Sequence, residues 1–182
     1  MTILICPGIH APDLTEKWLR GIQLGGDWNQ QQWLLYPAPQ WPAYSPPQIL
    51  QFLQTHCGEN PDPITFISFS AGVVGAIGAA RSWQTAGHIV HKFIACDGWG
   101  VPLVGDFPIY RLSHDYFTHW SSALLGAGAD NFYADPPVDH QQLWSYPHTT
   151  AGWWTHRGAG GQTSATRTTT AHFLQQVLSD QI

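Results

Sequence analysis

Two hydrophobic patterns alternate along this chain. Short, mostly apolar runs indicate strands that are buried on both faces, and longer segments with apolar residues three and four positions apart indicate helices with one buried side. The strands predicted in this way span residues 3–6, 33–36, 64–68, 92–95, 109–112 and 131–133. The predicted helices span residues 14–22 and 71–80, and two more begin at Ser45 and near Thr170.

This alternation predicts an α/β fold, a three-layer sandwich with a mostly parallel sheet and helices on both faces. With 182 residues, the chain is long enough for one such domain, which we expect to span residues 1–182. Ligands of parallel sheets bind beyond the carboxyl ends of the strands. Residues that directly follow a strand are therefore expected to lie on one rim of the molecule.

Residues 158–168, with the sequence GAGGQTSATRT, interrupt the alternation. They are mostly small or polar, no predicted strand precedes them, and they lack the Gly-Lys-Ser/Thr ending of a phosphate-binding loop. We expect this segment to be a mobile loop.

Ser70 lies between the predicted strand 64–68 and the predicted helix 71–80, with almost no loop between them. A serine at such a turn is held on a sharp backbone bend with its hydroxyl exposed. The N–H groups of the helix N-terminus then face any anion that forms beside it. This arrangement is typical of a nucleophile. The structural alternative is a turn in which Ser70 only caps the helix.

A serine hydroxyl needs a base to take its proton, and that base is usually a histidine oriented by a carboxylate. His140 follows the last predicted strand, at the start of a short helical segment, and is expected to share the rim with Ser70. His148 and His156 come later in the chain and are the alternatives.

Two aspartates end predicted strands and can supply the carboxylate. Asp115 ends the run PIYRLSHD and is the preferred candidate, whereas Asp97 ends the run KFIACDG one strand earlier. Either choice gives the chain order nucleophile, acid, histidine that α/β-hydrolases show. The structural alternatives are a helix cap for Asp115 and a turn residue for Asp97.

Stabilising the oxyanion of acyl transfer requires two N–H donors. One is expected to be that of Ala71, directly after the nucleophile, and the other that of Ile9 or His10, in the turn after the first strand. Tryptophan rings often line pockets, and the chain has ten of them. The residues expected to line the substrate pocket are His10, Phe69, Trp99, Trp120 and Trp144.

Composition narrows the class of partner and the compartment. Seven Lys and Arg against twelve Asp and Glu give a formal net charge of −5, without a basic run that could follow nucleic acid. The N-terminal apolar run is too short for a secretion signal, and no run reaches the roughly eighteen residues of a membrane span. Three cysteines, with Cys6 and Cys96 in apolar runs, indicate reduced thiols. We therefore expect a cytoplasmic protein that binds no nucleic acid and spans no membrane.

The order of these motifs resembles the small single-domain serine hydrolases related to retinoblastoma-binding protein nine, which are minimal α/β-hydrolases. The motifs that carry the resemblance are PGIH, SFSAG, RLSHDYFTHW, and VDHQQLW followed by AGWW. The resemblance implies a catalytic triad of Ser70, Asp115 and His140. This chain departs from the family at Ser68, which replaces the first glycine of the Gly-x-Ser-x-Gly elbow, at Phe69, and at Asp139 before the histidine.

The function predicted is a serine hydrolase that cleaves ester, thioester or amide bonds of small or medium apolar acyl groups through an acyl-serine. The alternative is a binding protein that has the hydrolase fold but no activity. Metal chemistry at His114, Asp115 and His119 is not expected, because their spacing matches no common zinc pattern. We expect no metal or cofactor, and whether the chain forms a homo-oligomer is left open.

Overall fold

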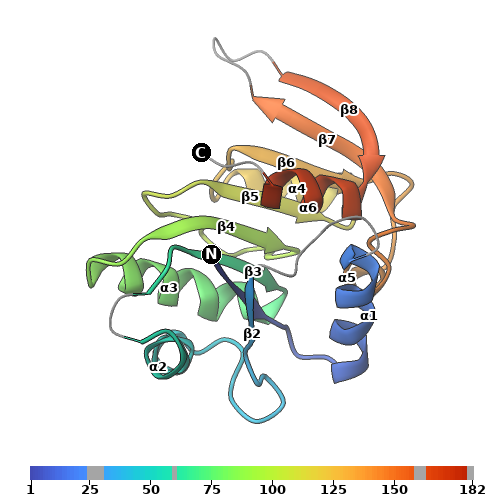
Figure 1. Cartoon of the computed structure of the whole chain (residues 1–182). Coiled ribbons are helices and arrows are strands. Elements are labelled where there is room, and N and C mark those ends of the chain that lie inside the picture. Colours follow the sequence, from blue (N-terminus) through green and yellow to red (C-terminus); the bar gives the residue numbers. More distant parts are fainter. Residues whose placement is uncertain (24–30, 59–60, 158–162, 180–182) are drawn as a thin grey trace.

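The structure is a computed structural model, and it describes residues 1–23, 31–58, 61–157 and 163–179. Eight strands form one sheet in the order β2-β1-β3-β4-β5-β6-β7-β8 (Figure 1). The first six are parallel, whereas β7 and β8 run antiparallel to their neighbours. The strands are β1 Thr2–Cys6, β2 Gln32–Leu35, β3 Ile64–Phe69, β4 Val90–Cys96, β5 Ile109–Ser113, β6 Asp130–Ala134, β7 Ala151–Arg157 and β8 Thr163–Thr169.

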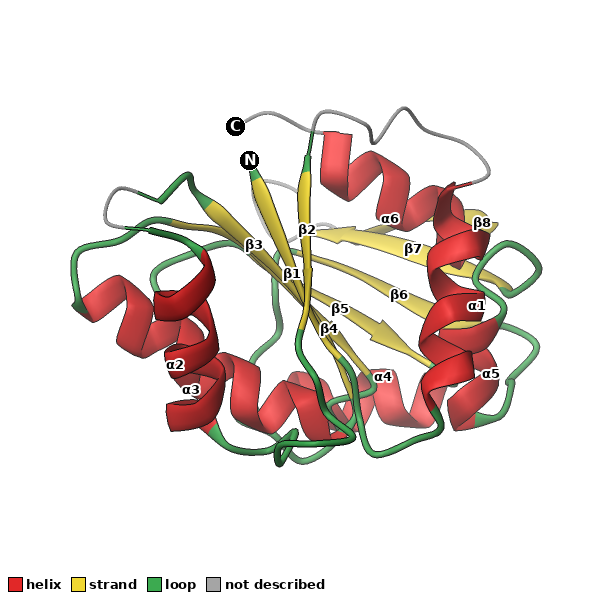
Figure 2. Ribbon diagram, turned by 60° about the horizontal axis from the view of Figure 1, so that its bottom comes forward, coloured by secondary structure: helices red, strands yellow, loops and turns green. Residues whose placement is uncertain are grey.

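Six helices cover the two faces of the sheet. The helices are α1 Pro12–Gln23, α2 Pro46–His56, α3 Ala71–Thr85, α4 Tyr116–Ala123, α5 His140–Ser145 and α6 Thr170–Ser179. Figure 2 shows α2, α3 and α4 on one side of the sheet, and α1, α5 and α6 on the other. The molecule is therefore the three-layer α/β sandwich that the sequence predicts.

Consecutive residues of the central strands enter opposite halves of the core. On β1, Leu4 packs with α2 and α3, while Ile3 and Ile5 pack with α1 and α6. On β3, Phe66 lies on the side of α2 and α3, and Ile67 lies on the side of α1 and α6. Side chains of a strand point alternately to the two faces, so a sheet covered on both sides needs apolar residues at nearly every position. This requirement explains the uninterrupted apolar runs in the sequence.

All six predicted strands are present, and the four predicted helices correspond to α1, α2, α3 and α6. The expected loop is wrong for residues 163–168, which belong to strand β8, while residues 158–162 lie outside the described residues. Strand β8 forms an edge of the sheet, and its first five residues are exposed. An exposed edge strand needs no apolar residues, and its four threonines suit an extended backbone.

The cysteines agree with the expectation of reduced thiols. Cys6 and Cys96 are free thiols buried in the core, where burial raises the pKa of both well above the usual range. They serve as small apolar side chains there.

In the described part of the chain, every helix is too short or too polar to pass through a bilayer.

The turn after β1 packs directly against the start of α3, and this contact depends on Gly72. A side chain at this position would clash with the carbonyl oxygens of Cys6 and Pro7. Both oxygens belong to the backbone, so neither can move without displacing β1. Gly72 therefore holds the end of β1 beside the residues that follow β3.

Replacing Gly72 by alanine is expected to lower the free energy of unfolding by about 1–3 kcal/mol, the usual cost of adding volume to a packed site. Urea denaturation measures this change. Val74→Ala, an exposed position on the same helix, is the control and should change the free energy of unfolding by less than about 0.5 kcal/mol. Equal stability of the Gly72→Ala variant and the wild type would contradict the packing described here.

Candidate active site

Ser70 occupies a strained backbone conformation between β3 and α3. Its φ of 53° and ψ of −123° lie where residues with a side chain are rarely found. The N–H of Ser70 donates to Cys96 O at 2.9 Å, which extends the pairing of β3 with β4 beyond the strand. Its side chain makes no capping hydrogen bond to α3, so the reading of Ser70 as a helix cap is wrong. The serine is held on a sharp bend with its hydroxyl uncommitted.

The turn that follows β1 lies against this serine. A Cβ atom built on Gly8 would approach the Cβ of Ser70 and the carbonyl oxygen of Phe69 to 2.9 Å each. The next residue, Ile9, is exposed. In the described part of the chain, the N–H groups of Ile9 and Ala71 donate no hydrogen bond outside helices and strands. Because Ala71 is the first residue of α3, its N–H has no carbonyl acceptor within the helix. The turn that carries Ile9 and the start of α3 therefore lie on either side of Ser70 in the chain fold, with Gly8 in contact with the serine.

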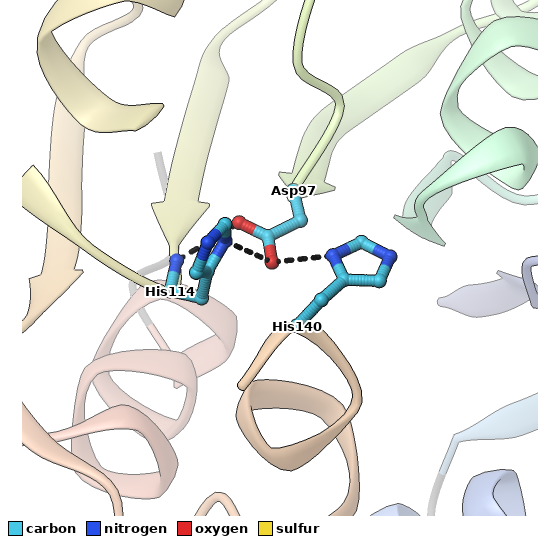
Figure 3. A group of neighbouring side chains, drawn as sticks. All are labelled: Asp97, His114 and His140. Carbon is cyan, nitrogen blue, oxygen red and sulfur yellow. Dashed lines mark hydrogen bonds and ion pairs between the residues drawn. The ribbon is translucent and has the colours of Figure 1, made fainter. Parts of the chain in front are cut away.

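Asp97 follows β4, the strand next to β3, and forms a hydrogen bond with His140. His140 Nδ1 lies 2.8 Å from Asp97 Oδ2, and His140 is the first residue of α5, shortly after β6 (Figure 3). An ionised carboxylate only accepts hydrogen bonds, so the proton of a neutral His140 must be on Nδ1. The other nitrogen, Nε2, then carries a lone pair, and it points away from Asp97 in Figure 3. The imidazole therefore turns one nitrogen to the carboxylate and leaves the other free of it.

A second histidine, His114, binds the other side of the same carboxylate. His114 Nδ1 lies 2.9 Å from Asp97 Oδ2, and the backbone N–H of His114 donates to Asp97 Oδ1 at 2.9 Å. Three donors thus surround a carboxylate whose side chain is only 1 % exposed. The hydrogen bond with Asp97 raises the pKa of His114, with further contributions from the charges of Asp97, Asp115 and Asp139. From the sequence, His114 was considered only as a metal ligand. Its position directly after β5 was the signal that it lies on the same rim as Ser70.

Asp97, the alternative acid, forms the hydrogen bond with His140, whereas the preferred Asp115 does not contact this histidine through a hydrogen bond among the described residues. Asp115 Oδ1 instead accepts a hydrogen bond of 2.7 Å from the backbone N–H of Thr118 and caps α4. Burial alone would raise the pKa of Asp115, but the hydrogen bonds from Thr118 outweigh it and lower the pKa. The helix cap, the structural alternative for Asp115, is therefore what the structure contains.

Ser70 and Asp97 share an unusual backbone feature. Among the described residues other than glycine, they alone have a positive φ, 53° for Ser70 and 51° for Asp97. They follow neighbouring strands at the same end of the sheet. Strained residues of this kind cluster at functional sites. The site therefore comprises Ser70, Asp97, His114 and His140, at the carboxyl ends of β3 to β6.

No hydrogen bond joins Ser70 to His140 among the described residues, but Phe69 connects their surroundings. The ring of Phe69 stacks on His140, with ring centres 4.7 Å apart and an interplanar angle of 24°. Phe69 also stacks on Trp144 and makes an edge-to-face contact with His10. The buried Phe69 thus supports the imidazole from the core.

The predicted pocket tryptophans occupy different environments. Trp144 is buried in the core, where it stacks on Trp18. Trp99 and Trp120 are 61 % and 55 % exposed on the outer surface near α4, and Trp99 Nε1 donates to Ser121 Oγ. Among the described residues, Trp144 therefore lies in the core, whereas Trp99 and Trp120 lie on the surface.

The alternative histidines lie away from Asp97. His156 is on β7, where Nδ1 lies 2.9 Å from Asp130 Oδ2. Asp130 is the first residue of β6, so this pair is at the opposite end of the sheet from His140. His148 lies in the turn that follows α5. Among the described residues, the histidines that form hydrogen bonds with Asp97 are His114 and His140.

Asp97, His114 and His140 also form a group that can hold a divalent metal ion, since one ligand atom of each lies within 4.8 Å of the others. However, both ring nitrogens are directed at the same carboxylate oxygen, as hydrogen-bond donors are (Figure 3). A metal ion would have to replace the protons on these nitrogens. His119, considered as a metal ligand from the sequence, does not belong to this group of described residues. Burial and the charge of Arg111 lower the pKa of His119 to about 4.

No protein-family model matches this chain, and a search of the curated proteins found no match either. Among the 19 similar chains of solved structures is YbtT, a type II thioesterase from the yersiniabactin NRPS/PKS biosynthetic pathway. It is 16 % identical with a TM-score of 0.39, and the similarity covers 52 % of this chain and 41 % of YbtT. This chain thus corresponds to less than half of YbtT. The class defined by fold and site is a three-layer α/β protein with a strained serine at the strand ends.

The raised pKa of His114 predicts a pH-dependent contribution to stability. The folded protein binds the proton more tightly, so the contribution is full below about pH 6.5, the unfolded value, and is lost as the pH rises through the folded pKa. His114→Gln removes this titration. The difference in unfolding free energy between wild type and variant should therefore be larger at about pH 5.5 than at about pH 9. Chemical denaturation at both pH values tests this, and an unchanged difference would contradict the assignment.

Proposed function

We propose that this chain is a serine hydrolase that cleaves carboxylic ester, thioester or amide bonds through an acyl-serine. Ser70 is the nucleophile, His140 is the general base, and Asp97 orients His140. The observation that carries this proposal is the 2.8 Å hydrogen bond between His140 Nδ1 and Asp97 Oδ2, beside a strained serine on the neighbouring strand. Their order in the chain, serine, aspartate and histidine, is that of α/β-hydrolases.

In the proposed first step, the Oγ of Ser70 attacks the carbonyl carbon of the substrate while its proton passes to His140 Nε2. The carbonyl oxygen becomes an oxyanion. When the tetrahedral intermediate collapses, the bond to the leaving group breaks, and His140 gives its proton to that group. Water then attacks the acyl-serine by the same route, releasing the acid and restoring Ser70. Asp97 accepts a hydrogen bond throughout and stabilises the imidazolium form of His140.

The oxyanion is proposed to bind between the N–H groups of Ala71 and Ile9, with that of His10 as the alternative second donor. Support comes from the close contact of Gly8 with Ser70 and from the free N–H at the start of α3. Preformed donors of this kind lower the barrier by about 3 kcal/mol each.

The gap between Ser70 and His140 is compatible with this mechanism. In many hydrolases the contact between nucleophile and base is longer without substrate and shortens in the complex. His140 is held from behind by Asp97 and on its face by Phe69, and these contacts fix its ring plane.

Ser70→Ala is expected to lower the turnover of p-nitrophenyl esters by at least ~10⁴-fold, because no other hydroxyl can form the acyl intermediate. Alanine has the same Cβ as serine, so the fold should be unchanged. Labelling by a fluorophosphonate probe should disappear in parallel. The matched control is Ser82→Ala, an exposed serine near the other end of α3, which should retain full activity and labelling. Full activity of Ser70→Ala would refute the mechanism.

A pair of identical substitutions distinguishes the two candidate acids. Asp97→Asn is expected to reduce kcat by about 10⁴-fold, because an amide can stabilise the wrong tautomer of His140 and cannot stabilise its cation. Asp115→Asn should change kcat by less than about threefold, since asparagine caps helices as well as aspartate does. Steady-state kinetics with one ester measures both. A larger loss in Asp115→Asn than in Asp97→Asn would restore Asp115 as the acid.

A further inference from the structure

A cavity of about 180 Å³ adjoins the proposed oxyanion turn on the side of strand β2. Gly8 belongs to both features, because it lines the cavity and its Cα lies against Ser70. The opposite wall is formed by the segment that follows β2. Gly8 is therefore the residue that connects the cavity to the surroundings of Ser70.

The walls of this cavity are apolar and rigid. The residues that supply most of them are Pro7, Pro12, Pro37, Pro39, Leu35 and Tyr36. Proline fixes the backbone, so four of them keep the cavity open at little conformational cost. None of the described lining residues is an aspartate, glutamate, lysine or arginine. The occupant must then be uncharged and mainly apolar.

His10 and Tyr36 are the titratable residues among the described lining residues, and burial raises the pKa of Tyr36 to about 12. Burial lowers the pKa of His10, and the nearby charge of His140 lowers it further. Its Nε2 lies 2.9 Å from Thr15 Oγ1, which also accepts a hydrogen bond from the indole N–H of Trp144. His10 is thus anchored to α1 and α5 as a fixed part of the wall.

We propose that this cavity binds the acyl chain of the substrate and selects uncharged acyl groups of medium length. A dry apolar cavity of about 150 Å³ is known to hold a benzene ring, so this one accommodates about six carbon atoms. This inference rests on the proposed function, because it places the chain relative to an acyl-serine at Ser70. The proposed binding region is thus the cavity beside β2, and not the surface around Trp99 and Trp120.

The experiment compares kcat/KM for p-nitrophenyl acetate, butyrate, hexanoate and dodecanoate. With wild type, kcat/KM should rise by up to about fourfold for each buried methylene as far as hexanoate. It should not rise further for dodecanoate, which exceeds the cavity. Leu35→Trp, at a half-exposed position of the wall, should lower the ratio of hexanoate to acetate at least tenfold by filling the cavity.

Two further variants complete the test. Leu35→Ala widens the cavity and should move the preferred chain to a longer ester, which keeps the inference testable if the tryptophan variant does not fold. Ile89→Trp places the same side chain at an exposed position before β4, at the opposite end of the sheet, and should leave the chain-length profile unchanged.

The outcomes separate the two proposals. If wild type hydrolyses acetate but shows no preference for longer chains, or if Leu35→Trp keeps the wild-type profile, the cavity assignment is overturned and the hydrolase stands. If wild type hydrolyses none of the esters and Ser70 is not labelled by a fluorophosphonate, the proposed function fails, and the cavity assignment falls with it.

Discussion

The buried carboxylate of Asp97 is the interaction on which the candidate site depends. A carboxylate removed from water is costly unless donors surround it, and here the donors are His114, through its ring and backbone, and His140. They come from the segments after β5 and β6. Satisfying one carboxylate at the end of β4 therefore fixes the ends of two further strands. The orientation and tautomer of His140 follow from the same hydrogen bond.

The backbone ladder of the sheet holds the strained residues in place. Ser70 N–H donates to Cys96 O, and Asp97 N–H donates to Leu112 O, each just past the end of a strand. The regular pairing of β3, β4 and β5 thus continues into the two residues with positive φ. A positive φ persists only where the surrounding structure compensates its cost. Gly8 and Gly72 add to this restraint, because they allow the turn after β1 to press on the same corner.

The sequence predicted the parts of this structure that depend on burial, and it failed where burial follows another pattern. Helix α4 was missed because its inner positions are Thr118 and Ser122, while Phe117 and Trp120 are exposed. That reversal removes the usual apolar stripe. The sequence analysis considered a helix cap as the alternative role of Asp115, but it predicted no helix after this residue and preferred Asp115 over Asp97. The choice between the two aspartates therefore depended on a helix whose hydrophobic pattern gives no sign of it.

The strain at the site argues for chemistry rather than for a binding scaffold alone. A serine or aspartate with positive φ costs on the order of 1–3 kcal/mol, a considerable part of the roughly 5–15 kcal/mol that stabilises a folded domain. Glycine would adopt the same angles without that cost, and this chain uses 18 glycines elsewhere. At both positions the side chain is what glycine lacks: a hydroxyl without a partner at Ser70, and a carboxylate that orients a histidine at Asp97. A turn that served only to connect β3 to α3 would require neither.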